Sequence, residues 1–261
     1  MNITGQVAVI TGAGRHGGVG AAIAKQLAQS GCNLVLNCLN SRDEIQQIAN
    51  DCSKHAVDVI VHVGDLTQEP VCQELAQLTQ AKFGKANIVV NCLGFSKAIP
   101  TERLDLVTPE LFEKTFNVNT LAPFLVAKAF HQLLKESGNG VLINVSSTAG
   151  FTGKSSSLPY AVAKGALNTL TLALAQALSP EIRVNAVCPS FIDSSWWRDK
   201  FPDQTKYENL KQNIRENNLL RRILEPNDVA LAILSVIGNP AMTGELIKLD
   251  AGAHIGKANP R

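Results

Sequence analysis

The sequence predicts an α/β domain of the doubly wound kind, with one parallel sheet and helices on both of its faces. Short continuous apolar runs alternate with longer segments of helical periodicity, which is typical of fully buried parallel strands joined by crossover helices. Because such crossovers are right-handed, the helices fall on both faces of the sheet. The chain has 261 residues, 45% of them apolar and 18% charged, which suits one compact domain over residues 1–261.

Seven apolar runs are predicted as the strands of this sheet. The first run precedes a segment in which Ile23 and Leu27, four residues apart, give a helix its inward face and Gly31 its stop signal. The same alternation then repeats along the chain. The predicted strands span residues 7–11, 34–37, 57–63, 88–91, 141–145, 182–187 and 245–249. The predicted helices span about residues 20–30, 42–52, 69–83, 109–116, 121–135, 159–178 and 226–238.

The stretch 189–220 interrupts this alternation. It follows a predicted strand, is rich in polar residues and carries Trp196 and Trp197. A long irregular excursion after a strand is more typical of a functional lid than of a structural connector, so we expect a substrate loop here. The two tryptophans either line an apolar substrate pocket or its cover, or they contact another subunit.

Charge and cysteine usage exclude several classes of function. The 24 basic and 22 acidic residues are interspersed, so no basic block can follow a nucleic-acid backbone. The apolar stretches fall short of the roughly 20 residues that cross a bilayer, and no signal peptide is visible, so we expect a cytoplasmic protein without a membrane partner. Six cysteines without a CxxC pair or a Cys/His cluster predict reduced thiols and no metal site.

A glycine-rich segment follows the first predicted strand and leads directly into a helix. It reads Thr11-Gly12-Ala13-Gly14-Arg15-His16-Gly17-Gly18-Val19-Gly20. Glycines let a pyrophosphate approach the backbone, and the helix N-terminus attracts the anion. A tight turn without a ligand is the alternative, but five glycines in ten residues between a strand and a helix favour a dinucleotide site.

The end of the second predicted strand indicates which dinucleotide binds. An acid there would hold the ribose diol of NAD, whereas basic residues accommodate the 2′-phosphate of NADP. The segment from Asn37 to Arg42 contains no acid. Arg15 and Arg42 are candidates to clamp the extra phosphate, which favours NADP(H) and leaves NAD(H) possible. Both arginines could equally be ordinary surface charges.

Tyr160 and Lys164 lie four residues apart in a strongly helical segment, so phenol and ammonium share one face. A fixed positive neighbour favours the phenolate and would bring the pKa of Tyr160, ordinarily about 10, towards neutrality. Alone, this spacing is a weak signal, because tyrosine and lysine often simply pack on a helix surface.

Further motif-like segments occur elsewhere along the chain and belong with Tyr160 and Lys164. They are Gly64-Asp65-Leu66, Asn91-Cys92-Leu93-Gly94, Asn117-Val118-Asn119, Asn144-Val145-Ser146-Ser147 and the run from Arg183 to Pro189, followed by Ile192 and Ser194. With the glycine loop, Tyr160 and Lys164, they resemble the motifs of the short-chain dehydrogenase/reductase family, in the family's order and over essentially the whole chain.

The resemblance implies a Rossmann-type domain and a role for each matched residue. Tyr160 would be the general acid or base, Lys164 would hold the ribose and lower the pKa of Tyr160, Ser147 would bind the carbonyl oxygen, and Asn119 would position a relay water. Donors placed at that oxygen stabilise the charge that grows as hydride arrives. The implied cofactor contacts are Gly12, Gly14, Arg15, Gly18, Val19, Gly20, Asn37, Arg42, Asp65, Leu66, Asn91, Gly94, Tyr160, Lys164, Pro189, Ile192 and Ser194.

The chain departs from the family's pattern in a few places. The glycine loop is two residues longer than usual, and Cys92 and Leu93 replace an asparagine and an alanine. Ser190 and Ala251 each stand where a glycine is usual. These departures bear on cofactor geometry, but they leave every side chain of the expected tetrad in place.

Three functions compete at this point. The first is an NADPH-dependent carbonyl reductase similar to the 3-oxoacyl carrier-protein reductases. Residues 138–140 and 179–181 lack the basic side chains that would hold an acidic carrier protein, so we expect small ketones as its substrates. The second is a dehydrogenase of a sugar, steroid or other secondary alcohol, and the third a non-catalytic cofactor-binding sensor. The resemblance also implies a homotetramer.

Overall fold

The computed structural model describes residues 3–199, 201 and 203–257. Its centre is a seven-stranded parallel sheet in the order β3-β2-β1-β4-β5-β6-β7. The strands are β1 (Val7–Thr11), β2 (Asn33–Cys38), β3 (Val59–Val63), β4 (Ile88–Asn91), β5 (Gly140–Val145), β6 (Ile182–Pro189) and β7 (Leu246–Leu249). The predicted doubly wound α/β fold is confirmed.

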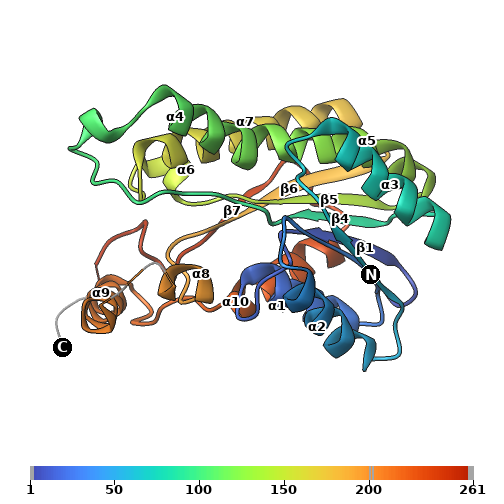
Figure 1. The fold of residues 1–261 in the computed structure, drawn as a ribbon, viewed down its shortest axis with the longest axis horizontal. Helices are drawn as coiled ribbons and strands as arrows, with labels where there is room; N and C mark the ends of the chain where they lie inside the picture. The colour runs from blue at the N-terminus through green and yellow to red at the C-terminus, as the bar shows by residue number, and fades with distance from the viewer. Residues whose placement is uncertain (1–2, 200, 202, 258–261) are drawn as a thin grey trace.

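Helices cover both faces of the sheet (Figure 1). On one face lie α1 (Val19–Gln29), α2 (Arg42–Ser53) and α10 (Pro226–Gly238). On the other lie α3 (Glu69–Phe83), α4 (Pro109–Phe116), α5 (Ala122–Glu136), the short α6 (Ala149–Thr152) and α7 (Leu158–Leu178). A short 3-10 helix, η1 (Leu104–Leu106), precedes α4.

The sheet separates two apolar cores, because successive residues of a strand point to opposite faces. Along β1, Ala8 and Ile10 pack with α1, α2 and α10, whereas Val7 and Val9 pack with α3 and α5. All five residues of β1 are buried, which explains its continuous apolar sequence. The arrangement fixes the carboxyl ends of β1, β4, β5 and β6 side by side at one edge.

The chain between α4 and α5 differs from the prediction. Residues 117–120 were expected to separate two helices, but Asn117–Leu121 forms a π-helical turn, η2, that continues α4 directly into α5. A π-helical turn inserts an extra residue into a helix and is frequent at functional sites. Asn119 lies within this turn.

The excursion 189–220 is less irregular than expected. It contains a short helix, α8 (Ser195–Arg198), and a longer one, α9 (Gln204–Asn217). Tyr207 is the buried residue of α9, so the helix is polar on almost every side and shows little apolar periodicity. The prediction of an irregular segment was wrong for this reason.

Ala251, which stands where the family usually has glycine, adopts a φ of 53°, in the left-handed region that glycine favours. Its carbonyl oxygen accepts a hydrogen bond from the amide of Leu220 at 3.1 Å, which ties the turn after β7 to the end of the excursion. The substitution therefore leaves the backbone turn intact. Within the described part of the chain, no helix is long and apolar enough to cross a membrane.

Candidate active site

The glycine loop packs closely against the backbone that follows β4. A Cβ atom at Gly12 would lie 2.7 Å from the Cα of Leu93, and Gly12 has a φ of 67°. A Cβ at Gly20 would lie 2.5 Å from the carbonyl oxygen of Gly12, so the start of α1 also requires glycine. The two predicted motifs after β1 and β4 therefore meet at the same edge of the sheet.

Gly14 and Gly18 complete this cradle. A Cβ at Gly14 would lie 2.3 Å from the Cβ of Cys38, which places the loop against the end of β2. Gly18 is the N-cap of α1, and among the described residues no side chain caps it, so the first N–H groups of the helix, from Val19 onward, face the loop. This donor set suits a pyrophosphate.

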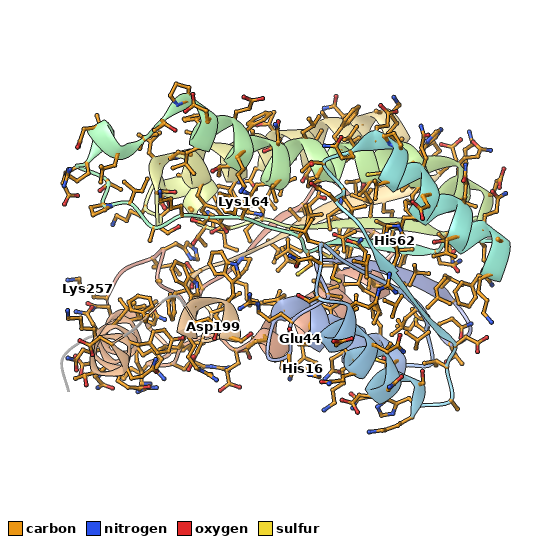
Figure 2. The ribbon with its side chains drawn as sticks, viewed as in Figure 1. His16, Glu44, His62, Lys164, Asp199 and Lys257 are labelled. Carbon is orange, nitrogen blue, oxygen red and sulfur yellow. The ribbon has the colours of Figure 1, made fainter. Side chains whose placement is uncertain are left out.

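The two arginines predicted to bind the 2′-phosphate have different surroundings. Arg15 forms an ion pair with Asp199, one residue beyond α8, and Arg42 is exposed at the first position of α2. The amide of His16 donates a hydrogen bond to Oε1 of Glu44 at 2.5 Å. Figure 2 labels His16 and Glu44 near α1 and Asp199 near α8. The loop is thus held between α2 and the segment after β6.

Asn37 and Asp65 lie at the neighbouring ends of β2 and β3. Asn37 is 2% exposed, and its Nδ2 lies 3.0 Å from Nδ1 of His62 and donates to the carbonyl oxygen of Gly64 at 3.3 Å. Asp65 is exposed and accepts hydrogen bonds from the amide and the hydroxyl of Thr67, while Leu66 is buried. The Asn37 amide thus joins two strands, and the Asp65 carboxylate faces solvent.

Asn91, at the end of β4, is 1% exposed and donates to Oδ1 of Asn144 at 3.0 Å and to the carbonyl oxygen of Pro123 at 3.3 Å. Its own Oδ1 has no hydrogen-bond partner among the described residues. Gly94 lies in the exposed part of the same loop, and a Cβ there would lie 3.3 Å from Oδ1 of Asn119. The loop after β4 therefore touches the π-helical turn.

Asn119 is fully buried, and both polar atoms of its side-chain amide are hydrogen-bonded. Its Nδ2 donates to the carbonyl oxygen of Phe95 at 2.7 Å and to that of Thr115 at 2.8 Å. Its Oδ1 accepts from the amide of Phe95 at 3.4 Å. The π-helical turn presents this side chain to the loop after β4, because a regular helix would rotate it away.

Ser147 follows β5 and lies beside Tyr160 of α7. Its Oγ donates to the carbonyl oxygen of Pro189 at 3.3 Å and accepts from the amide of Ala149 at 3.1 Å. Ser147 is also close enough to the phenol of Tyr160 to lower the pKa of that phenol. The ends of β5, β6 and the first turn of α7 therefore bring a hydroxyl and a phenol together.

Lys164 lies one helical turn after Tyr160. It is 3% exposed, and its Nζ donates to the carbonyl oxygen of Val145 at 2.9 Å and lies 5.7 Å from the centroid of the Tyr160 ring. Figure 2 shows Lys164 in the layer of α7, close to the sheet. The three predicted side chains after β5 are thus assembled in one place.

The pKa values of Tyr160 and Lys164 differ from those expected from the sequence. Burial raises the pKa of Tyr160 to about 12, and the nearby Ser147 side chain acts in the opposite direction. Burial lowers the pKa of Lys164 to about 8. The expectation that the positive neighbour brings Tyr160 towards the phenolate is therefore wrong for the chain on its own: the phenol is a protonated acid at neutral pH.

The strand β6 ends at Pro189, which is buried and accepts hydrogen bonds on its carbonyl oxygen from Ser147 and from the amide of Thr148. Ile192 pairs with Leu224 in an isolated parallel bridge. Ser194 is 5% exposed and is the N-cap of α8. These residues lead from the site into the excursion.

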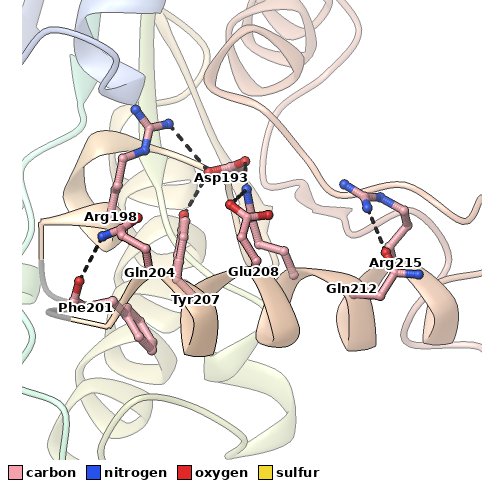
Figure 3. A network of polar contacts seen from close by, with 9 residues as sticks. Asp193, Arg198, Phe201, Gln204, Tyr207, Glu208, Gln212 and Arg215 are labelled. Atoms are coloured by element: carbon pink, nitrogen blue, oxygen red, sulfur yellow. Dashed lines mark hydrogen bonds and ion pairs between the residues drawn. The ribbon is translucent and has the colours of Figure 1, made fainter.

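Asp193, between those two predicted contacts, was missed by the sequence analysis. It accepts hydrogen bonds from the hydroxyl of Tyr207 at 2.8 Å and from Nζ of Lys211 at 3.2 Å, and it pairs with Arg198 at 3.8 Å (Figure 3). These partners hold the pKa of the carboxyl below its usual value. The only available signal was an acid among apolar residues after a strand, and its partners are too distant in sequence to predict.

The tryptophans pack within the excursion itself. Trp197 stacks on Phe191 with ring centroids 5.5 Å apart, and Trp196 meets Trp197 edge to face at 4.8 Å. Phe201 and Tyr207 extend this aromatic cluster towards α9. The cluster gives the excursion an apolar centre of its own.

All six cysteines are free thiols. Cys92, in the loop after β4, is close enough to Lys164 to interact electrostatically with it, and burial raises the pKa of its thiol to about 12. The thiol therefore stays protonated and unreactive at neutral pH. Across the residues that the structure describes, no group of three or more His, Cys, Asp or Glu side chains could hold a metal ion.

Comparison with known proteins agrees with this geometry. Residues 12–254 match a family model described as enoyl-(acyl carrier protein) reductase. The chain is 31% identical over 249 residues to a ketoacyl reductase assigned to the granaticin polyketide synthase of Streptomyces violaceoruber, covering 95% of this chain and 96% of that one. It is 30% identical over 260 residues to a versicolorin reductase of Emericella nidulans, covering 96% of each.

Solved structures show the same similarity. A protein from Burkholderia xenovorans, assigned as a short-chain dehydrogenase/reductase, superposes with a TM-score of 0.88 at 30% identity, covering 97% of this chain and 99% of that one. Three findings lead to one conclusion: the glycine-rich loop after β1, the assembled cluster of Ser147, Tyr160 and Lys164, and these relatives. The chain belongs to the short-chain dehydrogenase/reductase family and is an NAD(P)-dependent oxidoreductase.

Proposed function

We propose that this enzyme reduces the carbonyl group of small ketones and uses NADPH as the hydride donor. One observation carries this reaction type: the phenol of Tyr160, which is protonated at neutral pH, lies beside Ser147 and Lys164 at the ends of β5 and β6. A protonated phenol can give its proton to a carbonyl oxygen as that oxygen becomes negative. The cofactor, when bound, supplies the hydride.

Ser147 and Tyr160 would act on the same substrate oxygen. The hydroxyl of Ser147 donates a hydrogen bond to it, and Tyr160 transfers a proton to it, so both interactions strengthen as negative charge develops. Their separation is fixed by the ends of two neighbouring strands and by α7. Such prior positioning lowers the barrier without any further reorganisation of the protein.

Lys164 and Asn119 would support this proton transfer. The buried ammonium of Lys164 places a positive charge beneath Tyr160, which stabilises the phenolate left after the proton has gone. Asn119 fixes the loop after β4 through the backbone of Phe95, and its carbonyl group is suited to position a water. The proton lost by Tyr160 is then replaced from solvent.

The residues around the glycine loop fit a dinucleotide phosphate. The proposed contacts are Gly12, Gly14, Gly18, Val19 and Gly20 with the pyrophosphate, where any Cβ at Gly12, Gly14 or Gly20 would collide with the backbone or with Cys38. Arg15 and Arg42 flank the end of β2 and would bind the 2′-phosphate. The remaining proposed cofactor contacts are Asn37, Asp65, Leu66, Asn91, Gly94, Tyr160, Lys164, Pro189, Ile192 and Ser194.

Small ketones are preferred over carrier-bound thioesters. The segments 138–140 and 179–181 contain one acid and no base, so they offer nothing that would hold an acidic carrier protein.

We also propose that the whole chain acts as one domain, with the excursion as its lid. We further propose that it works in the cytoplasm and that it assembles as a homotetramer.

Calorimetric titration with NADPH and NADH tests the cofactor, and NADPH oxidation with a panel of small ketones tests the reaction. We expect NADPH to bind more tightly and its absorbance to fall when a ketone is added. The double variant Arg15→Ala with Arg42→Ala should weaken NADPH far more than NADH. Equal losses for both cofactors would contradict the proposed phosphate site, and no binding of either would contradict the function.

A further inference from the structure

The lengthened glycine loop is in direct contact with the lid. Oγ of Ser195 donates a hydrogen bond to the carbonyl oxygen of His16 at 2.7 Å, and the amide of Ser195 donates to that of Gly17 at 3.3 Å. Both carbonyls lie between Gly12 and Gly18, the interval of the loop that is two residues longer than usual. This lengthened interval of the loop therefore contacts the start of α8 directly.

An ion pair adds a third contact between the same two segments. Arg15 pairs with Asp199, and their side chains are 46% and 60% exposed. An ion pair at this exposure contributes little to stability and exchanges partners easily. The guanidinium of Arg15 is therefore available to a stronger anion that approaches the loop.

The contact at α8 is connected to the rest of the lid. Arg198, adjacent to Asp199, pairs with Asp193, which in turn accepts hydrogen bonds from Tyr207 and Lys211 of α9 (Figure 3). The ring of Trp197 in α8 stacks on Phe191. A displacement of α8 must therefore be passed on to α9.

The charged side chains around Arg15 would make Asp199 and a bound phosphate compete for the guanidinium. Besides Asp199, the loop faces Glu44, which accepts a hydrogen bond from the amide of His16, and Arg42 stands at the start of the same helix as Glu44. A phosphate dianion near Arg15 would be attracted by the two arginines and repelled by Asp199. Even if the guanidinium contacted both anions, this repulsion would remain.

We propose that Arg15, Ser195 and Asp199 form a latch between the glycine loop and the lid, and that the 2′-phosphate of NADP(H) competes with Asp199 for Arg15. This rests on the proposed cofactor site. NADP(H) then loosens the lid, whereas NAD(H), which lacks the phosphate, leaves the latch closed. Asp199 is thus a specificity-determining residue that lowers the enzyme's preference for the phosphorylated cofactor.

The test is calorimetric titration of the full-length protein with NADPH and NADH. Asp199→Asn should bind NADPH more tightly, by up to about fivefold, the upper end of the range for an exposed ion pair, and bind NADH as the wild type does. Asp58→Asn is the matched control: it removes an equally exposed aspartate, paired with Lys82, at the opposite edge of the sheet, and should change neither affinity.

Hydrogen exchange provides a second readout that does not depend on turnover. Amides 195–199 should exchange faster with NADPH bound than with NADH bound, and Asp199→Asn should abolish this difference. Ser195→Ala removes one latch contact without changing charge, so it should speed exchange of these amides with either cofactor. Because the closed latch is weakened, it should also tighten NADPH relative to NADH, by less than Asp199→Asn does.

The possible failures are distinguishable. If the wild type binds neither cofactor, the proposed function and the latch both fall. If both cofactors bind but Asp199→Asn leaves the ratio of their affinities unchanged, or alters both equally, the latch is wrong and the proposed function stands. Equal exchange of residues 195–199 with NADPH and NADH would also overturn the latch.

Discussion

The ammonium of Lys164 donates a hydrogen bond to the carbonyl oxygen of Val145 at 2.9 Å, which places a charged side chain that is only 3% exposed under the end of β5. Burial lowers the pKa of this lysine to about 8, while an unfolded lysine titrates near 10.4. The charge is held beside Tyr160 despite the cost of desolvation. The fold therefore keeps this ammonium buried at the expense of stability.

This difference in pKa gives stability a defined dependence on pH. Below about pH 8 both the folded and the unfolded states carry the proton on Lys164; between about pH 8 and 10.4 only the unfolded state does. The unfolding free energy of the wild type should therefore rise over this interval relative to that of Lys164→Met. Urea unfolding of both proteins at pH 7.5 and at about pH 9.5 measures it, and parallel pH profiles would contradict the assignment.

Asn119 should contribute to stability as well as to catalysis. Asn119→Ala leaves the carbonyl oxygens of Phe95 and Thr115 without this donor in a buried site, which should cost about 2 kcal/mol of unfolding free energy. Turnover should fall with it. The half-buried Asn117, in the same π-helical turn, offers the control, because Asn117→Ala should cost much less. Equal losses in chemical denaturation would show that the turn, rather than the Asn119 amide, determines the effect.

His62 should make the protein sensitive to mild acid. Burial lowers its pKa below the ordinary value of about 6.5, and its Nδ1 lies 3.0 Å from Nδ2 of Asn37. As the pH falls through about 6.5, the unfolded state binds a proton that the folded state resists, so the unfolding free energy falls until the folded pKa is passed. Denaturation at pH 7.5 and pH 5.5 should show a larger loss for the wild type than for His62→Gln. A variant with the same loss would rule out His62 as the source.

Ala56 offers a stabilising substitution far from the site. It is exposed, follows the end of α2 and has a φ of 58°, where an L-residue other than glycine is strained by about 1–2 kcal/mol. Ala56→Gly relieves this strain and should gain about 0.5–1 kcal/mol after the entropic cost of glycine. Ala22→Gly, within α1, should instead lose about 1 kcal/mol. Thermal unfolding of both variants measures the contrast, and a loss at position 56 would contradict it.

Much of the fold is predictable because its signals are local. The bounds of β1, β4, α3, α4 and α10 agree with those expected from the sequence. The buried strands are continuous apolar runs, and each of these three helices has a proline in its first turn, where the missing N–H costs nothing. Motif order was then sufficient to locate Ser147, Tyr160 and Lys164 on neighbouring elements.

The parts that escaped prediction depend on contacts distant in sequence or on weak patterns. The helix α9 buries one residue, so its periodicity is faint, although Asp203, whose carboxylate accepts from the amides of Thr205 and Lys206, is a recognisable N-cap. The pair of Arg15 with Asp199 spans 184 positions, and nothing in either segment indicates the other. The raised pKa of Tyr160 arises from burial, which no spacing rule reports.

Tyr160→Phe tests the central claim most directly. The variant keeps the ring and removes the proton donor, so calorimetry should show NADPH bound nearly as tightly as by the wild type, while ketone-dependent NADPH oxidation should fall by about 10²–10⁴-fold. That pairing of retained binding with lost turnover is the predicted result. Undiminished turnover by Tyr160→Phe would contradict the assignment of Tyr160 as the acid, and with it the proposed reaction at this site.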